Sequence, residues 1–149
     1  MPNKGFTLIE ILIVIGIMAI LATAIILAIN PPRQFAQARN TQRWSNVNNI
    51  LDAIYQNAIE NRGIFTCAAG TLPSSATPMK VGVGGYDICA CLVPTFLGSM
   101  PFDPSASGAA YTDCNTYDTG YTVMQNATSS RVTIAAPTAE IGAVISVTR

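Results

Sequence analysis

One acidic side chain adjoins a long apolar run near the start of this chain. Glu10 lies directly before Ile11–Ile29, a stretch that contains no charged residue. A helix of about 19 residues spans about 28 Å, which is close to the thickness of the hydrocarbon core of a bilayer. A carboxylate beside such a helix costs roughly up to 3 kcal/mol at mid-bilayer and less near an end. We therefore expect a specific partner to meet the charge of Glu10.

The composition restricts what the remainder of the chain can do. With 149 residues, the chain is long enough for one domain with a modest core. Its formal net charge of zero argues against general nucleic-acid binding, which relies on neutralising phosphates. The absence of histidine from the sequence excludes histidine-based acid–base catalysis and histidine metal ligands. Because the sequence also shows no catalytic triad or phosphate loop, we expect no enzymatic activity.

Two helices are predicted in the first part of the chain. Residues 6–30 predict a membrane-spanning helix, and residues 33–62 predict an amphipathic one. Pro31 and Pro32 lie between them, and we expect a kink or a short unwound stretch there because proline lacks a backbone donor. Apolar residues recur at helical spacing along the second helix, namely Val47, Leu51, Ile54 and Ala58, with Trp44 and Ile50 beside them.

Three segments near the C-terminus predict a small antiparallel sheet, because they are rich in β-branched residues and partly alternate. They are residues 121–125, 131–135 and 143–148, with a hairpin loop after the first of them. Residues 63–119 predict irregular structure, apart from a short strand within 86–93 and a rigid turn at 100–104. One face of the sheet would cover the amphipathic helix, which gives an α+β fold.

All four cysteines follow the apolar run, at Cys67, Cys89, Cys91 and Cys114. An even number of cysteines beyond an export or anchor segment indicates an oxidising compartment and disulfides. A zinc site is less favoured, because the Cys89-Ala-Cys91 spacing does not match a common zinc knuckle. We expect Cys89 and Cys91 to pair with Cys67 and Cys114 rather than with each other, and both such connectivities remain open.

The string Gly5-Phe6-Thr7-Leu8-Ile9-Glu10, between a short basic leader and an apolar helix, resembles the class III signal of type IV pilins and pseudopilins. The resemblance implies that a prepilin peptidase removes residues 1–5 by cutting between Gly5 and Phe6. It also implies N-methylation of Phe6. The same resemblance gives Glu10 a partner, the α-amino group of Phe6 on a neighbouring subunit. Such pairing would relieve two charges that are each costly in apolar surroundings.

The resemblance further implies a structural role, as the subunit of a type IV pilus-like filament. Residues 6–30 would form the filament core, and residues 31–149 would form the globular head. The implied partners are other copies of the chain, prepilin peptidase, the pilus assembly ATPase with its platform machinery, and membrane lipid. Before assembly the chain would span the membrane once with its N-terminus in the cytoplasm, and afterwards it would lie in an extracellular or cell-envelope filament. A pseudopilin of a type II secretion system is the alternative within the family.

An ordinary secretory signal peptide is the alternative outside the family. Ala22-Thr23-Ala24 is an acceptable cleavage site after an apolar stretch, and its use would release a disulfide-bonded binding protein. The weak basic leader and the acid beside the apolar stretch argue against it.

The arginines after the apolar helix create a conflict in topology. Arg33, Arg39 and Arg43 follow the helix, and the positive-inside rule alone would keep the C-terminal part in the cytoplasm. The cysteines and the signal point the other way, and we follow them. We expect these arginines to lie on a solvated helix face.

Three aspartates of the irregular region are candidate calcium ligands, at Asp103, Asp113 and Asp118. Some pseudopilins hold calcium in the corresponding loop, which is the only reason to consider a cofactor. The sequence has no EF-hand spacing. We therefore favour solvated loop acids, with no cofactor and no metal.

Overall fold

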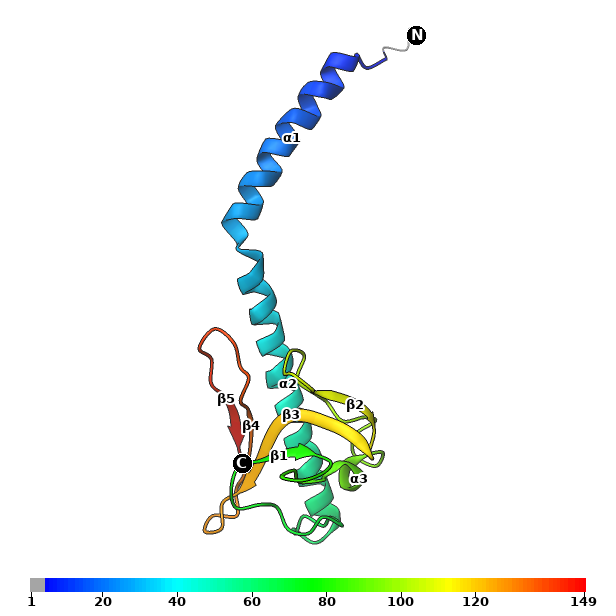
Figure 1. Cartoon of the computed structure of the whole chain (residues 1–149), viewed down its shortest axis with the longest axis vertical. Helices are drawn as coiled ribbons and strands as arrows, with labels where there is room; N and C mark the ends of the chain where they lie inside the picture. Colours follow the sequence, from blue (N-terminus) through cyan, green and yellow to red (C-terminus); the bar gives the residue numbers. More distant parts are fainter. Residues whose placement is uncertain (1–4) are drawn as a thin grey trace. The chain divides into compact units, whose positions relative to one another are not determined.

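The computed structural model describes residues 5–149, apart from the side chains of residues 27 and 28. Figure 1 shows its elements along the chain. The chain divides between Phe35 and Ala36 into two compact units. The first unit contains the helix α1, and the second contains a sheet with most of the helix α2.

α1 spans Leu8–Ile29 and consists almost entirely of apolar residues. All of its described side chains are exposed. The segment Leu8–Ile26 is long and apolar enough to cross a membrane. So large an apolar surface requires a cover, either lipid or other protein.

One residue separates α1 from α2, which spans Pro31–Glu60. Asn30 adopts the left-handed conformation, with φ 49° and ψ 72°, and so ends α1. Its carbonyl oxygen then accepts from the backbone N–H of Arg33 at 3.1 Å. The interruption therefore lies at Asn30, while Pro31 and Pro32 belong to the first turn of α2. Proline fits there because the first N–H groups of a helix have no intrahelical acceptor.

The apolar stripe of α2 is buried as the helical spacing predicts. Val47, Ile50, Leu51 and Ile54 are each at most 1% exposed. Trp44, which lies beside this stripe, is 42% exposed. The neighbouring Arg43 occupies the buried face of the helix in its place.

The sheet has five antiparallel strands, with β2 paired to β3 beside the path β1-β3-β4-β5. The strands are β1 (Thr77–Lys80), β2 (Ala110–Asp113), β3 (Thr116–Gln125), β4 (Val132–Ala136) and β5 (Ile145–Thr148). Alternate side chains of β3 are buried from Tyr117 to Val123, so one face of the strand points into the core. The three predicted C-terminal strands are confirmed, because 121–125, 131–135 and 143–148 overlap β3, β4 and β5 in turn.

Two strands and one short helix differ from the sequence-based expectation. β1 and β2 lie in the region predicted to be irregular. Pro78 interrupts the β pattern of β1, but proline is tolerated on an edge strand because it has no N–H to donate. The strand predicted within 86–93 is wrong, and α3 (Cys89–Leu92) lies there instead. The backbone N–H groups of Ile88 and Cys89 donate to the Tyr117 hydroxyl, at 2.9 and 3.2 Å, rather than to a neighbouring strand.

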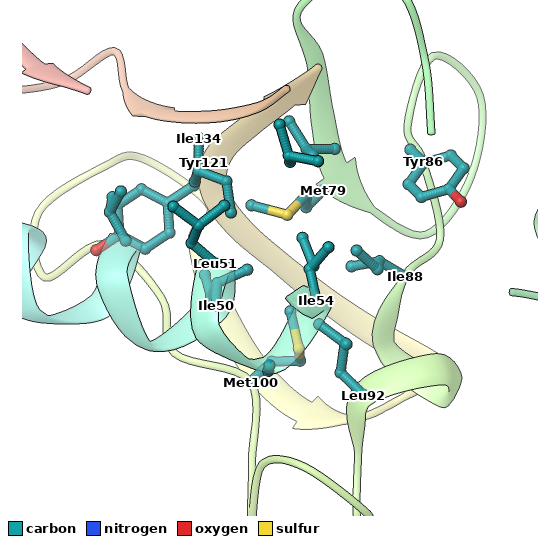
Figure 2. Packing of buried hydrophobic residues seen from close by; sticks show 14 of the residues in the cluster. Ile50, Leu51, Ile54, Met79, Tyr86, Ile88, Leu92, Met100, Tyr121 and Ile134 are labelled. Atoms are coloured by element: carbon teal, nitrogen blue, oxygen red, sulfur yellow. The ribbon is translucent and has the colours of Figure 1, made fainter. Parts of the chain in front are cut away.

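The core lies between α2 and one face of the sheet, which confirms the predicted α+β arrangement. Figure 2 shows Ile50, Leu51 and Ile54 of α2 packed among side chains from the strands and loops. The labelled partners are Met79, Tyr86, Ile88, Leu92, Met100, Tyr121 and Ile134. Within the described part of the chain, every member of this buried cluster comes from Val47 or later.

Two disulfides close the loops around α3. Cys67 bonds to Cys91 and Cys89 bonds to Cys114, with Cα–Cα distances of 5.2 and 5.3 Å. Cys89 and Cys91 therefore do not pair with each other, which confirms that expectation and selects one of the two open connectivities. Side chains two residues apart on a helix point in nearly opposite directions, so α3 can hold one bridge on each side.

Candidate processing and assembly site

The proposed cleavage site lies in non-helical backbone. Gly5 and Phe6 precede α1, and the Phe6 side chain is 77% exposed. The rest of the expected leader, residues 1–4 with Lys4, lies outside the described residues. The Gly5–Phe6 peptide bond is therefore free of the hydrogen bonds of α1 and open to its surroundings.

Thr7 caps the N-terminus of α1. Its backbone is extended, with φ −82° and ψ 150°, and its Oγ1 accepts from the backbone N–H of Glu10 at 3.3 Å. Its carbonyl oxygen accepts from the Ile11 N–H at the same distance. Sequence analysis missed this cap, although a threonine three residues before a glutamate is the signature of a capping box.

Glu10 lies in the first turn of α1 and is exposed. A negative charge in the first turn is favourable because the N-terminal end of a helix carries a partial positive charge. Within residues 5–149 no side chain donates a hydrogen bond to its carboxylate. The structure thus leaves this carboxylate available for a partner from another molecule.

A second group of charged side chains lies inside the head. Arg43 of α2 and Asp103 are both 0% exposed at their side chains, and Arg43 Nε donates to Asp103 Oδ2 at 2.7 Å. Asp103 also accepts from the Thr138 hydroxyl and from the backbone N–H groups of Ser105 and Ala106. Burial opposes ionisation of Asp103, but the hydrogen bonds from Arg43 and these neighbours outweigh it and lower its pKa to about 2.

Glu140 extends this group towards the surface. Its carboxylate accepts from Arg39 Nε at 2.7 Å and from Arg43 Nη1 at 2.8 Å. These hydrogen bonds, from Arg39 first and Arg43 second, lower the pKa of Glu140 to about 2. The Asn40 side chain donates to the Glu140 carbonyl oxygen and accepts from its backbone N–H. Three residues of α2 thus hold the loop between β4 and β5.

These contacts correct the expectation for the arginines and for Asp103. Arg33 is exposed as expected, but Arg39 is half-buried and Arg43 is fully buried in ion pairs. Asp103 is likewise buried rather than a solvated loop acid. The sequence gives little sign of this, because the partners of Arg43 lie 60 and 97 residues further along the chain.

The three candidate calcium ligands are not brought together. Both carboxylate oxygens of Asp103 already accept hydrogen bonds from Arg43. Asp113 and Asp118 each accept from a backbone N–H two residues further on, at 2.8 Å. Across residues 5–149, the structure forms no cluster of three cysteine or acidic side chains suited to a metal ion.

One protein-family model matches the N-terminal segment of the chain. Residues 1–26 match the family model described as the prokaryotic N-terminal methylation motif, which covers Thr7, Glu10 and most of α1. No curated protein and no solved structure matches the chain. The exposed Gly5–Phe6 segment, the acid at the start of an apolar helix and this match agree with one another. The chain carries the class III signal peptide of type IV pilins and pseudopilins.

Proposed function

We propose that the mature chain is a structural subunit of a type IV pilus-like filament and polymerises through α1. The observation that carries this proposal is the exposed apolar surface of α1 with one carboxylate in its first turn, within the segment that matches the methylation motif. A membrane anchor alone has no need for that carboxylate, whereas a polymer can use it to set the register of neighbouring helices.

Leader removal creates the partner for the carboxylate. Hydrolysis of the Gly5–Phe6 bond frees the α-amino group of Phe6, which then receives a methyl group. An amine and a carboxylate are each costly in apolar surroundings, and pairing Glu10 with Phe6 of the next subunit relieves both. Because each subunit offers a different group to each neighbour, the contact is heterologous and repeats along an open helical filament.

The remaining partners follow from this route. Prepilin peptidase acts on the precursor in the membrane, where α1 is covered by lipid. An assembly ATPase and its platform protein then transfer α1 from lipid to the growing filament. The head, with its two disulfides, lies on the outer side of the membrane throughout, which is the compartment where disulfides persist.

Replacement of Glu10 tests the proposal. Glu10→Gln keeps the length of the side chain and the backbone N–H that Thr7 caps, but it removes the charge. We expect normal membrane insertion and a yield of sheared filaments lower by at least about tenfold, because about 1.4 kcal/mol corresponds to a factor of ten and an unpaired buried charge costs more. Glu60→Gln, at the exposed end of α2, is the matched control. Normal filament yield from Glu10→Gln contradicts the proposal.

A strain that lacks the gene distinguishes a pilus subunit from a pseudopilin. If the chain is a pilus subunit, electron microscopy of cells without it shows a loss of surface fibres while protein secretion continues. A pseudopilin gives the opposite result, with secreted enzymes retained in the periplasm and surface fibres unchanged. Restoring the gene must reverse either defect.

A further inference from the structure

The start of α1 lies very close to the bond that processing breaks. Thr7 is the N-cap, Leu8 is the first helical residue, and the Gly5–Phe6 bond lies just upstream in non-helical backbone. The hydrogen bond from the Glu10 N–H to Thr7 Oγ1 fixes this boundary. A helix that began two or three residues earlier would include the scissile bond.

Little else in the sequence opposes such an extension. Once a helix has formed, each added residue gains one hydrogen bond and changes the free energy only slightly. Phe6 has an ordinary helix propensity, and Gly5 is the first residue upstream that resists helix formation strongly. A typical N-cap changes the equilibrium between a helix that begins at Leu8 and a longer one by about fivefold. Thr7 can therefore decide whether Phe6 is helical.

Peptidases cut exposed and irregular backbone far more readily than helical backbone. In a helix, the hydrogen bonds of neighbouring turns and the side chains around them shield the peptide groups. Hydrolysis requires that water add across the Gly5–Phe6 amide, leaving a carboxylate on Gly5 and an amine on Phe6. A helix that begins after this amide leaves both of its sides accessible to the enzyme.

We propose that Thr7 is a positioning residue for leader removal. By making α1 begin at Leu8, its side chain keeps the Gly5–Phe6 bond in non-helical backbone at the membrane surface. This inference rests on the proposed function, which supplies the peptidase. The cap uses the backbone N–H of Glu10 and leaves the Glu10 carboxylate for the neighbouring subunit, so processing and assembly depend on different groups of the same turn.

The test compares variants of the full precursor in lipid vesicles with a purified prepilin peptidase. Thr7→Val keeps the shape of the side chain but removes the acceptor oxygen, whereas Thr7→Ser keeps the oxygen. Thr23→Val is the matched control, because the Thr23 hydroxyl donates to the Ala19 carbonyl oxygen in the middle of α1 and caps nothing. Mass spectrometry gives kcat/KM for cleavage, and NMR chemical shifts of residues 5–10 locate the first helical residue.

For Thr7→Val we expect a helix that begins before Leu8 and a kcat/KM at least about threefold lower than that of the wild type. This factor follows from the free energy that a typical N-cap contributes. Thr7→Ser and Thr23→Val should be cleaved at the wild-type rate. Wild-type cleavage of Thr7→Val, or slower cleavage without a change in the helix start, overturns the inference and leaves the proposed function intact. If the wild-type precursor itself is not cut between Gly5 and Phe6, the proposed function fails first.

Discussion

Arg43 of α2 and Asp103 of the loop before β2 form an ion pair in which neither side chain is exposed. Two hydrogen bonds join them, from Arg43 Nε to Oδ2 at 2.7 Å and from Arg43 Nη2 to Oδ1 at 3.0 Å. Arg43 Nη2 also donates to the Ser105 hydroxyl. Among the described residues, no buried side-chain nitrogen or oxygen lacks a partner. The polar atoms of the pair therefore all have hydrogen-bond partners. The pair holds a long loop against α2, the helix that packs on the core.

Breaking this pair should destabilise the head strongly. Asp103→Asn preserves the shape of the side chain but removes the buried counter-ion of Arg43, which keeps only its ion pair with the partly exposed Glu140. We expect the free energy of unfolding to fall by about 3–5 kcal/mol. Chemical denaturation of the detergent-solubilised chain, followed by near-ultraviolet circular dichroism, measures the change. Asp113→Asn, at an exposed position, should change it by less than about 0.5 kcal/mol.

The same group of charges predicts a loss of stability in acid. Asp103 and Glu140 both have a folded-state pKa of about 2, below their ordinary values of 3.8 and 4.5. The unfolded chain therefore binds protons more readily, and the stabilisation is complete above about pH 5 and lost as the pH falls towards 2. For the buried Asp103 this amounts to about 2 kcal/mol.

Denaturation at pH 7, 5 and 2 measures this dependence. The Asp103→Asn variant should lose less stability between pH 5 and pH 2 than the wild type, because it has one carboxylate fewer to protonate. A wild-type head whose free energy of unfolding is constant down to pH 2 would show that the two carboxylates are not held as described.

The disulfide connectivity can be read from unreduced peptides. Proteolysis without reduction, followed by fragmentation of the backbone between Cys89 and Cys91 in the mass spectrometer, should yield one fragment that joins Cys67 to Cys91 and another that joins Cys89 to Cys114. Replacing Cys67 and Cys91 together by serine should lower the free energy of unfolding by about 3 kcal/mol, as expected for a closed loop of this length. Peptides that link Cys67 to Cys114 contradict the connectivity.

The intact mass of the mature chain distinguishes the two signal types. We expect a mass that begins at Phe6 with one added methyl group, because residues 1–26 match the methylation motif. A chain that begins at Ile25 indicates cleavage after Ala24 by a secretory signal peptidase. That result removes most of α1 from the mature protein and contradicts the proposed filament.

Features that depend on local sequence were predictable, and those that depend on distant pairs were not. The apolar run predicts α1, and the alternation of apolar and polar residues predicts β4 and β5. Each pattern can be recognised within a short stretch of sequence. The cap at Thr7 was also readable, from its spacing to Glu10. The pairing of Arg43 with Asp103 joins residues 60 positions apart, and no local pattern indicates that an arginine will be buried.

The two missed strands have a related cause. β1 contains a proline and has only four residues, and three of the four side chains of β2 are exposed, so neither strand shows a usable alternation. Their positions are set by pairing with β3, which lies more than 30 residues after the start of β1. The error at 86–93 has the same origin, since the Tyr117 hydroxyl and the disulfides determine that segment's backbone.

Among the residues that the structure describes, the buried cluster of the head consists of Val47 and later positions. Its packing therefore does not depend on whether α1 is surrounded by lipid or packed against α1 of other subunits. In the proposed filament, the head can therefore be added to the polymer already folded, with no refolding step.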